Sequence, residues 1–159
     1  MKKIIVSLLS IFIFFTAFST NAFAATPKYM AETHGYWESG SDLCGKTWAF
    51  RLYRDGDFVY RAWVQSEDGV DWYYINGYEM VDPSSSSCND NGGSPWLKID
   101  GRWYLFNPGG KLVKKEGWEW SANAGKWMYW IPGNYGLATN ESKVIDGVTY
   151  YFDSNGYMK

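Results

Sequence analysis

Apolar and aromatic residues occur in short runs along most of the chain, and turns that contain glycine separate these runs. The run "RWYLF" (102–106) follows an Asp-Gly pair at 100–101, and "TYYF" (149–152) follows a second Asp-Gly pair at 146–147. Asp-Gly pairs are typical of tight hairpin turns, and short runs rich in aromatic residues favour β-strands. Each run is therefore predicted to be the second strand of a β-hairpin.

The hairpin pattern recurs along the chain. Five copies begin at glycines that are 22 to 32 residues apart, namely Gly45, Gly69, Gly101, Gly125 and Gly147. A lone hairpin is only marginally stable in water, so each copy must bury its aromatic face against its neighbours. Tandem copies of such a unit predict a short solenoid of β-hairpins.

The predicted domain organisation has three parts. Residues 1–24 contain two lysines, an apolar run and an Ala-x-Ala site, which is the pattern of a signal peptide; an uncleaved membrane anchor is the alternative. Residues 25–62 are predicted to be an irregular N-terminal β region, and residues 63–159 to be the hairpin repeats. A cluster of Ser, Asn, Gly and Pro at 82–95 interrupts the repeats and is predicted to be a surface loop insertion.

The chain has two cysteines, Cys44 and Cys88. In an exported protein a pair of cysteines favours a disulfide, and free thiols are the alternative. The bridge would close the N-terminal part of the chain, where the repeat is least regular. The predicted fold is therefore all-β, with tandem β-hairpin repeats that form a short solenoid and a less regular, disulfide-stapled N-terminal β region.

Composition and charge narrow the class of protein. The chain has 10 Trp, 13 Tyr and 9 Phe, more aromatic surface than a core of this size requires, so aromatic faces are predicted to form a binding surface as well as packing. Removal of Lys2 and Lys3 with the signal peptide leaves 13 basic residues against 17 acidic ones. This acidic balance argues against nucleic acid or an anionic membrane as a partner, and no membrane insertion is expected after signal cleavage.

The sequence offers little for catalysis or metal binding. His34 is the only histidine, which excludes a metal site with two histidine ligands. Acidic residues gather around Glu38 and around Asp68, and two of them would supply the carboxylates of a glycoside hydrolase, but such groups are more typical of solvated turns. We therefore expect a protein that is not an enzyme and that uses no cofactor or metal.

The best-preserved copy is "WLKIDGRWYLFNPGGKL", which begins at Trp96 and contains Gly101 and Trp103. Its W-x4-G-x-W-Y pattern, with a later glycine and apolar residue, resembles the cell-wall-binding repeats of Gram-positive surface proteins. These repeats include the choline-binding repeats of autolysins and the related glucan-binding repeats. The resemblance covers residues 95–159 and extends more weakly back to Trp63.

The resemblance implies that aromatic residues of consecutive repeats form shallow cages for the quaternary ammonium group of choline on teichoic acids. A glucan-type polysaccharide of the cell envelope is the alternative ligand. A quaternary ammonium group has no hydrogen-bond donor, and cation–π contacts with several ring faces suit it. The residues that match the implied cage positions are Trp96, Trp103, Tyr104, Trp120, Trp127, Tyr129, Tyr150 and Tyr151, with a weaker set of Trp63, Trp72 and Tyr73.

These features predict a secreted protein, associated with the cell wall, that binds choline or an envelope carbohydrate. The alternative is a secreted effector, such as a bacteriocin-like factor or a small wall hydrolase, whose activity lies in residues 25–62 and which uses the repeats only for targeting. A structural protein whose hairpins contact other proteins is a third hypothesis. Solenoid ends and unpaired hairpin edges also allow a homodimer.

Overall fold

The protein consists of short antiparallel strands. The computed structural model describes residues 35–42, 45–53, 56–84 and 93–159, and none of these residues is helical. The strands are β1 (Gly35–Asp42), β2 (Gly45–Leu52), β3 (Ala62–Gln65), β4 (Trp72–Asn76), β5 (Glu79–Met80), β6 (Trp96–Ile99), β7 (Arg102–Leu105), β8 (Gly117–Ser121), β9 (Lys126–Trp130), β10 (Ser142–Ile145) and β11 (Val148–Tyr151).

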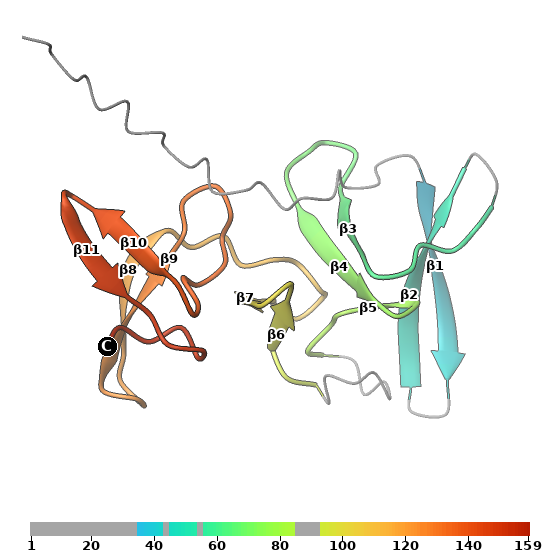
Figure 1. The fold of residues 1–159 in the computed structure, drawn as a ribbon. Coiled ribbons are helices and arrows are strands. Elements are labelled where there is room, and N and C mark those ends of the chain that lie inside the picture. The colour runs from blue at the N-terminus through green and yellow to red at the C-terminus, as the bar shows by residue number, and fades with distance from the viewer. Residues whose placement is uncertain (1–34, 43–44, 54–55, 85–92) are drawn as a thin grey trace, which may run out of the picture.

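Consecutive strands pair into hairpins, which we number one to five in chain order. They are β1–β2, β3–β4, β6–β7, β8–β9 and β10–β11, and β5 adds a third strand beside β4. Figure 1 shows the hairpins in a row, with β1–β2 at one end and β10–β11 at the other. No sheet of the described residues closes into a barrel. The predicted all-β architecture of antiparallel hairpins is confirmed.

The two Asp-Gly pairs form tight turns, as the sequence predicts. Asp100 and Gly101 have φ angles of 49° and 84°, and Asp146 and Gly147 have φ angles of 51° and 80°. Positive φ at both central residues gives the two-residue turn that matches the twist of antiparallel strands. These turns set the register of the third and fifth hairpins.

A short tail after each hairpin fixes how that hairpin meets the one before it. In each tail, one backbone N–H donates to the second strand of its own hairpin; the donors are Val59, Val81, Val113, Ala138 and Lys159. In the last three tails, the residue before that donor bonds the previous hairpin, and these bonds run from Leu112 to Trp72 (2.7 Å), from Leu137 to Trp103 (2.9 Å) and from Met158 to Trp127 (2.8 Å). The hairpins therefore share one register, and a position in one hairpin has structural counterparts in the others.

The core is divided among the contacts between neighbouring hairpins. Four interfaces follow in chain order, and each has its own cluster of buried apolar side chains. At the second interface, the ring centroid of Trp63 lies 5.0 Å from that of Tyr104 and 6.1 Å from that of Phe106 in the next hairpin. Aromatic rings thus supply much of the packing that holds the row together.

Parts of the predicted organisation lie outside the described residues. These parts include the signal peptide at 1–24 and both Cys44 and Cys88, so the disulfide stays a prediction. Part of the predicted N-terminal β region is described, and it forms the first hairpin. Within the described part of the chain there is no helix long and apolar enough to cross a membrane.

Candidate ligand-binding pockets between the hairpins

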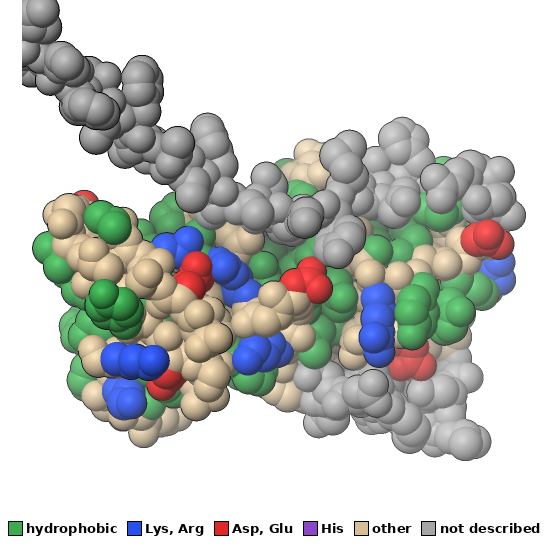
Figure 2. Space-filling view, viewed as in Figure 1, with side chains coloured by type: hydrophobic (Ala, Val, Ile, Leu, Met, Phe, Trp, Pro, Cys, Tyr) green, Lys and Arg blue, Asp and Glu red, His purple; other side chains and the backbone are tan. Residues whose placement is uncertain are grey.

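At three of the four interfaces, tryptophans of the described residues line an open pocket. The pocket volumes are about 410 Å³ at the first interface and about 330 Å³ at both the third and the fourth. Figure 2 shows hydrophobic side chains exposed near both ends of the row, where the first and fourth interfaces lie. The two tryptophans that line the fourth pocket, Trp118 and Trp127, are 36% and 42% exposed. A ligand can therefore reach these ring faces from solvent.

The three pockets are built from the same four positions. One tryptophan comes from the first strand of a hairpin and one from its second strand, while the next hairpin adds one side chain from its second strand and one from its tail. In this order, the first pocket has Trp37, Trp48, Tyr73 and Met80, the third has Trp96, Trp103, Met128 and Leu137, and the fourth has Trp118, Trp127, Tyr150 and Met158. The first pocket is also lined by Asp82 and Gly109, and the third by Asn155 and Tyr157.

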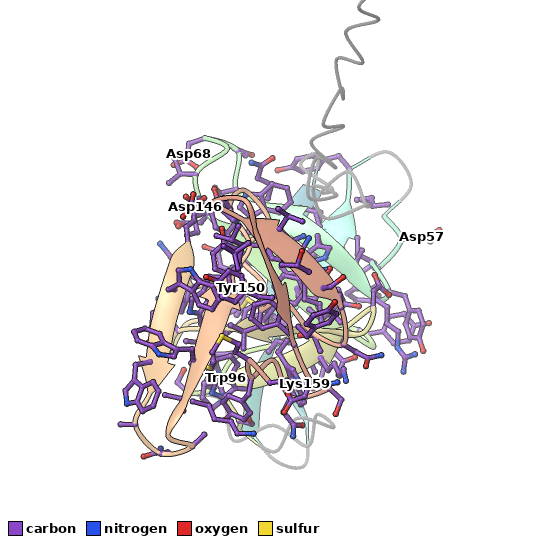
Figure 3. All side chains as sticks on the ribbon, turned by 60° about the vertical axis from the view of Figure 1, so that its left-hand side comes forward. Asp57, Asp68, Trp96, Asp146, Tyr150 and Lys159 are labelled. Atoms are coloured by element: carbon purple, nitrogen blue, oxygen red, sulfur yellow. The ribbon has the colours of Figure 1, made fainter. Side chains whose placement is uncertain are left out.

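The rings of the fourth pocket stand at steep angles to one another. Trp118 and Trp127 have centroids 6.4 Å apart and planes at 84°, and Trp118 and Tyr150 are 4.8 Å apart at 72°. Figure 3 shows Tyr150 on the last hairpin, beside the strands of the fourth. In the first pocket, Trp37 and Tyr73 have a similar arrangement, 5.1 Å apart at 67°. Rings that meet at such angles form a concave site whose walls carry the negative potential of aromatic faces, which attracts cations.

Comparison with known families identifies two of these units. Residues 96–112 and 144–158 match the family model of the cell wall binding repeat, a model that is named for choline binding. These two segments of the chain are therefore cell wall binding repeats by similarity. The matched segments are the third and fifth hairpins with their tails, and the shared register extends the same repeat geometry to the other three hairpins.

Several similar solved structures are those of proteins from Streptococcus pneumoniae. Choline binding protein F from Streptococcus pneumoniae is 23% identical, with a TM-score of 0.45 over 80% of this chain and 38% of that one. The choline binding domain of Spr1274 from the same organism is 26% identical, with a TM-score of 0.33 over 42% of this chain and 92% of that one. The modular Cpl-1 endolysin, solved with a peptidoglycan analogue, is 21% identical, with a TM-score of 0.39 over 81% of this chain and 38% of that one.

The chain thus spans less than two fifths of the length of the first of these structures. Comparison with curated protein sequences gives no match.

The structure places five of the residues expected from the sequence in pockets. Trp96 and Trp103 line the third pocket, Trp127 and Tyr150 line the fourth, and Tyr73 lines the first. In the last tail, Met158 occupies the counterpart of Leu112, as the repeat pattern indicates.

The other expected residues lie elsewhere. Trp63 and Tyr104 are buried in the second interface, only 1% and 5% exposed, and Trp72 packs against them. Among the remainder, Trp120 is half exposed beside Trp127, Tyr129 packs on the fourth cluster, and Tyr151 is exposed; none of the three is among the pocket-lining residues.

Three tryptophans line pockets although the sequence analysis did not select them: Trp37, Trp48 and Trp118. The first-strand tryptophan is displaced in the sequence because turn length varies. Trp96 precedes Trp103 by seven residues across a two-residue turn, but the longer turn at 122–125 moves the fourth hairpin's counterpart from Trp120 to Trp118. Strand register, rather than spacing alone, is the signal that finds these residues.

Charge differs among the pockets. The first contains the carboxylate of Asp82, whose Oδ1 accepts the backbone N–H of Gly109 at 2.8 Å. At the third, the ammonium of Lys98 lies 5.6 Å from the Trp103 ring centroid, and Lys126 lies 5.9 Å from that of Tyr157. The electrostatic environment is therefore more favourable to a cationic ligand in the first pocket than in the third.

Proposed function

We propose that the chain is a secreted cell-wall-binding protein whose three pockets hold quaternary ammonium groups, such as those of choline on teichoic acids. The observation that carries this proposal is the recurrence of one pocket design, with two tryptophans and an apolar tail residue in the same register each time. The match of two hairpins to a cell wall binding repeat supports the same partner.

A quaternary ammonium group fits the pockets better than a sugar ring does. Sugars stack flat on one aromatic platform and need polar groups around their hydroxyls, whereas the fourth pocket is lined by Trp118, Trp127, Tyr150 and Met158 alone. Its rings stand at 72° and 84° to one another and so surround a compact group. Asp82 in the first pocket adds a negative charge that favours a cation.

The energetics call for several pockets on one chain. A desolvated cation–π contact contributes about 0.5–2 kcal/mol, so three rings give at most about 6 kcal/mol. Association costs reduce this to roughly millimolar binding at one pocket. A teichoic acid presents many choline groups, and simultaneous engagement of linked pockets raises avidity by about 10²–10⁴.

Retention on an affinity resin tests the proposal. The chain is passed over a choline-analogue resin and a glucan resin, and each column is washed with free choline. We expect retention on the first resin, release by choline and no retention on the second. A triple variant with Trp48→Leu, Trp103→Leu and Trp127→Leu removes one wall from each pocket and should pass through while it keeps its circular dichroism spectrum. Retention on glucan alone, or retention of the triple variant on the choline resin, would contradict the proposal.

A further inference from the structure

The second interface has the walls of a cage, but these walls line none of the described pockets; the pocket of about 460 Å³ at this interface is lined by other residues, among them Arg61, Leu97 and Asp100. Its four counterpart positions are Trp63, Trp72, Tyr104 and Leu112. Trp63, Tyr104 and Leu112 belong to the buried cluster of this interface and Trp72 packs against it, with Trp63 only 1% exposed. The counterpart of Trp63 at the fourth interface is Trp118, which is 36% exposed.

Ring geometry shows that the cage itself is intact. Trp63 and Trp72 are 6.3 Å apart at 77°, and Trp63 and Tyr104 are 5.0 Å apart at 70°. The corresponding values at the fourth interface are 6.4 Å at 84° and 4.8 Å at 72°. The two interfaces therefore share an arrangement of ring faces and differ in what covers it.

The cover comes from the hairpin two places further along the chain, which the described residues supply for the first three interfaces but not for the fourth. At the first interface that hairpin contributes the Gly109–Gly110 turn, and a Cβ built on Gly110 would lie 2.8 Å from the Met80 side chain. At the third interface the same position is Gly156, next to the side chain of Leu137. At the second interface the position is Tyr135, whose ring packs against the buried cluster.

Tyr135 adopts a backbone conformation that suits glycine better. Its φ of 61° lies in the left-handed region, as do those of Gly110 (77°) and Gly156 (85°). A side chain in this region costs about 1–2 kcal/mol, and contacts of the side chain must offset that strain. The neighbouring Asn134 accepts a hydrogen bond from the Tyr104 hydroxyl at 3.1 Å, and the Lys114 ammonium lies 5.7 Å from the Tyr135 ring centroid.

We propose that the second interface is a latent cage for a quaternary ammonium group, held closed by the side chain of Tyr135. The proposal rests on the function proposed above, because it assigns the same class of ligand to a fourth site. In this arrangement the wild-type chain binds ligand at the first, third and fourth interfaces, while the second joins the two halves of the row.

Substitution of Tyr135 by glycine tests the proposal, and Tyr135→Phe is the matched control because it keeps the covering ring. Indole N–H resonances report each interface separately during a choline titration, with Trp72 for the second and Trp127 for the fourth. In the wild-type and Tyr135→Phe proteins, we expect choline to shift Trp127 and leave Trp72 unmoved. In Tyr135→Gly, we expect Trp72 to shift with a midpoint within about tenfold of that for Trp127, since the ring geometry is shared.

The outcomes separate this inference from the proposed function. Failure of choline to move the pocket tryptophans in wild-type protein would refute the proposed function. Movement of Trp127 but not Trp72 in Tyr135→Gly would overturn the latent cage. Hydroxyl-radical labelling gives a ligand-free measurement, in which Trp63 should become reactive in the glycine variant and stay unreactive in the wild-type and Tyr135→Phe proteins. Tyr135→Asn is a second variant, because asparagine tolerates a positive φ. Loss of folding in both the glycine and the asparagine variant would overturn the proposal, because Tyr135 would then be a structural residue and not a removable cover.

Discussion

Replacement of Trp118 by leucine should weaken choline binding at the fourth pocket, whereas the same replacement at Trp120 should not. The two tryptophans lie two residues apart on strand β8, and only Trp118 lines the pocket. Removal of one aromatic face eliminates about 0.5–2 kcal/mol of cation–π attraction, which corresponds to about a 2- to 30-fold weaker affinity. Leucine keeps an apolar side chain against Tyr129 and Tyr150, whose ring centroids lie 5.1 and 4.8 Å from that of Trp118, so the hairpins should still pack.

The indole N–H resonance of Trp127 measures this effect at one pocket. Its chemical shift is followed against choline concentration in the wild-type protein and in both variants. The midpoint should rise 2- to 30-fold, as estimated above, in Trp118→Leu and remain within about twofold in Trp120→Leu. A weakened midpoint in Trp120→Leu with no change in Trp118→Leu would refute the assignment of pocket walls from strand register. Thermal unfolding of both variants controls for loss of the folded state.

Three other predictions concern charge, turn geometry and pH. Asp82→Asn keeps the oxygen that accepts the Gly109 N–H but removes the charge, so choline affinity at the first pocket should fall about two- to fivefold while that of the neutral analogue 3,3-dimethylbutan-1-ol stays unchanged in the same titration. Gly101→Ala and Gly110→Ala introduce the same left-handed strain of about 1–2 kcal/mol, but only Gly110→Ala places a Cβ 2.8 Å from the Met80 side chain. Urea unfolding should therefore show that Gly110→Ala lowers the free energy of unfolding by about 1–3 kcal/mol more than Gly101→Ala does. Equal losses of unfolding free energy in the two variants would contradict the packing argument. Burial raises the pKa of the Tyr104 hydroxyl, because the folded protein favours its neutral form. The stability that this neutral hydroxyl contributes is present below about pH 10 and is lost as the pH rises through the raised pKa. The urea midpoint should therefore fall more steeply at alkaline pH in the wild-type protein than in Tyr104→Phe.

The sequence predicted those parts of the pockets that short-range geometry determines. Trp103 and Trp127 each follow a turn glycine by two residues, and this spacing holds because both lie at the start of a second strand. The first-strand tryptophans vary in spacing because turn length changes between hairpins, and so Trp118 was not distinguished from Trp120. The pattern also failed to anticipate that Tyr104 is buried. It is buried beneath the tail of the next hairpin, where Asn134 accepts a hydrogen bond from its hydroxyl and Tyr135 packs against the same cluster.

The open and closed interfaces differ because the walls and the cover of a cage come from different hairpins. Two hairpins supply the walls, and at the second interface the fourth hairpin packs Tyr135 against the rings. Trp63 is 1% exposed, whereas its counterpart Trp118, over which no further hairpin of the described chain packs, is 36% exposed; the whole fourth hairpin therefore covers about one third of a tryptophan surface. Since a buried aromatic side chain covers about 150–250 Å², closure removes roughly 50–90 Å² from water and contributes about 1–2 kcal/mol at 25 cal/mol per Å². This is close to the contribution of one cation–π contact. Closure of the second interface therefore exchanges one weak binding site for a gain in the stability of the row that is about the size of one cation–π contact.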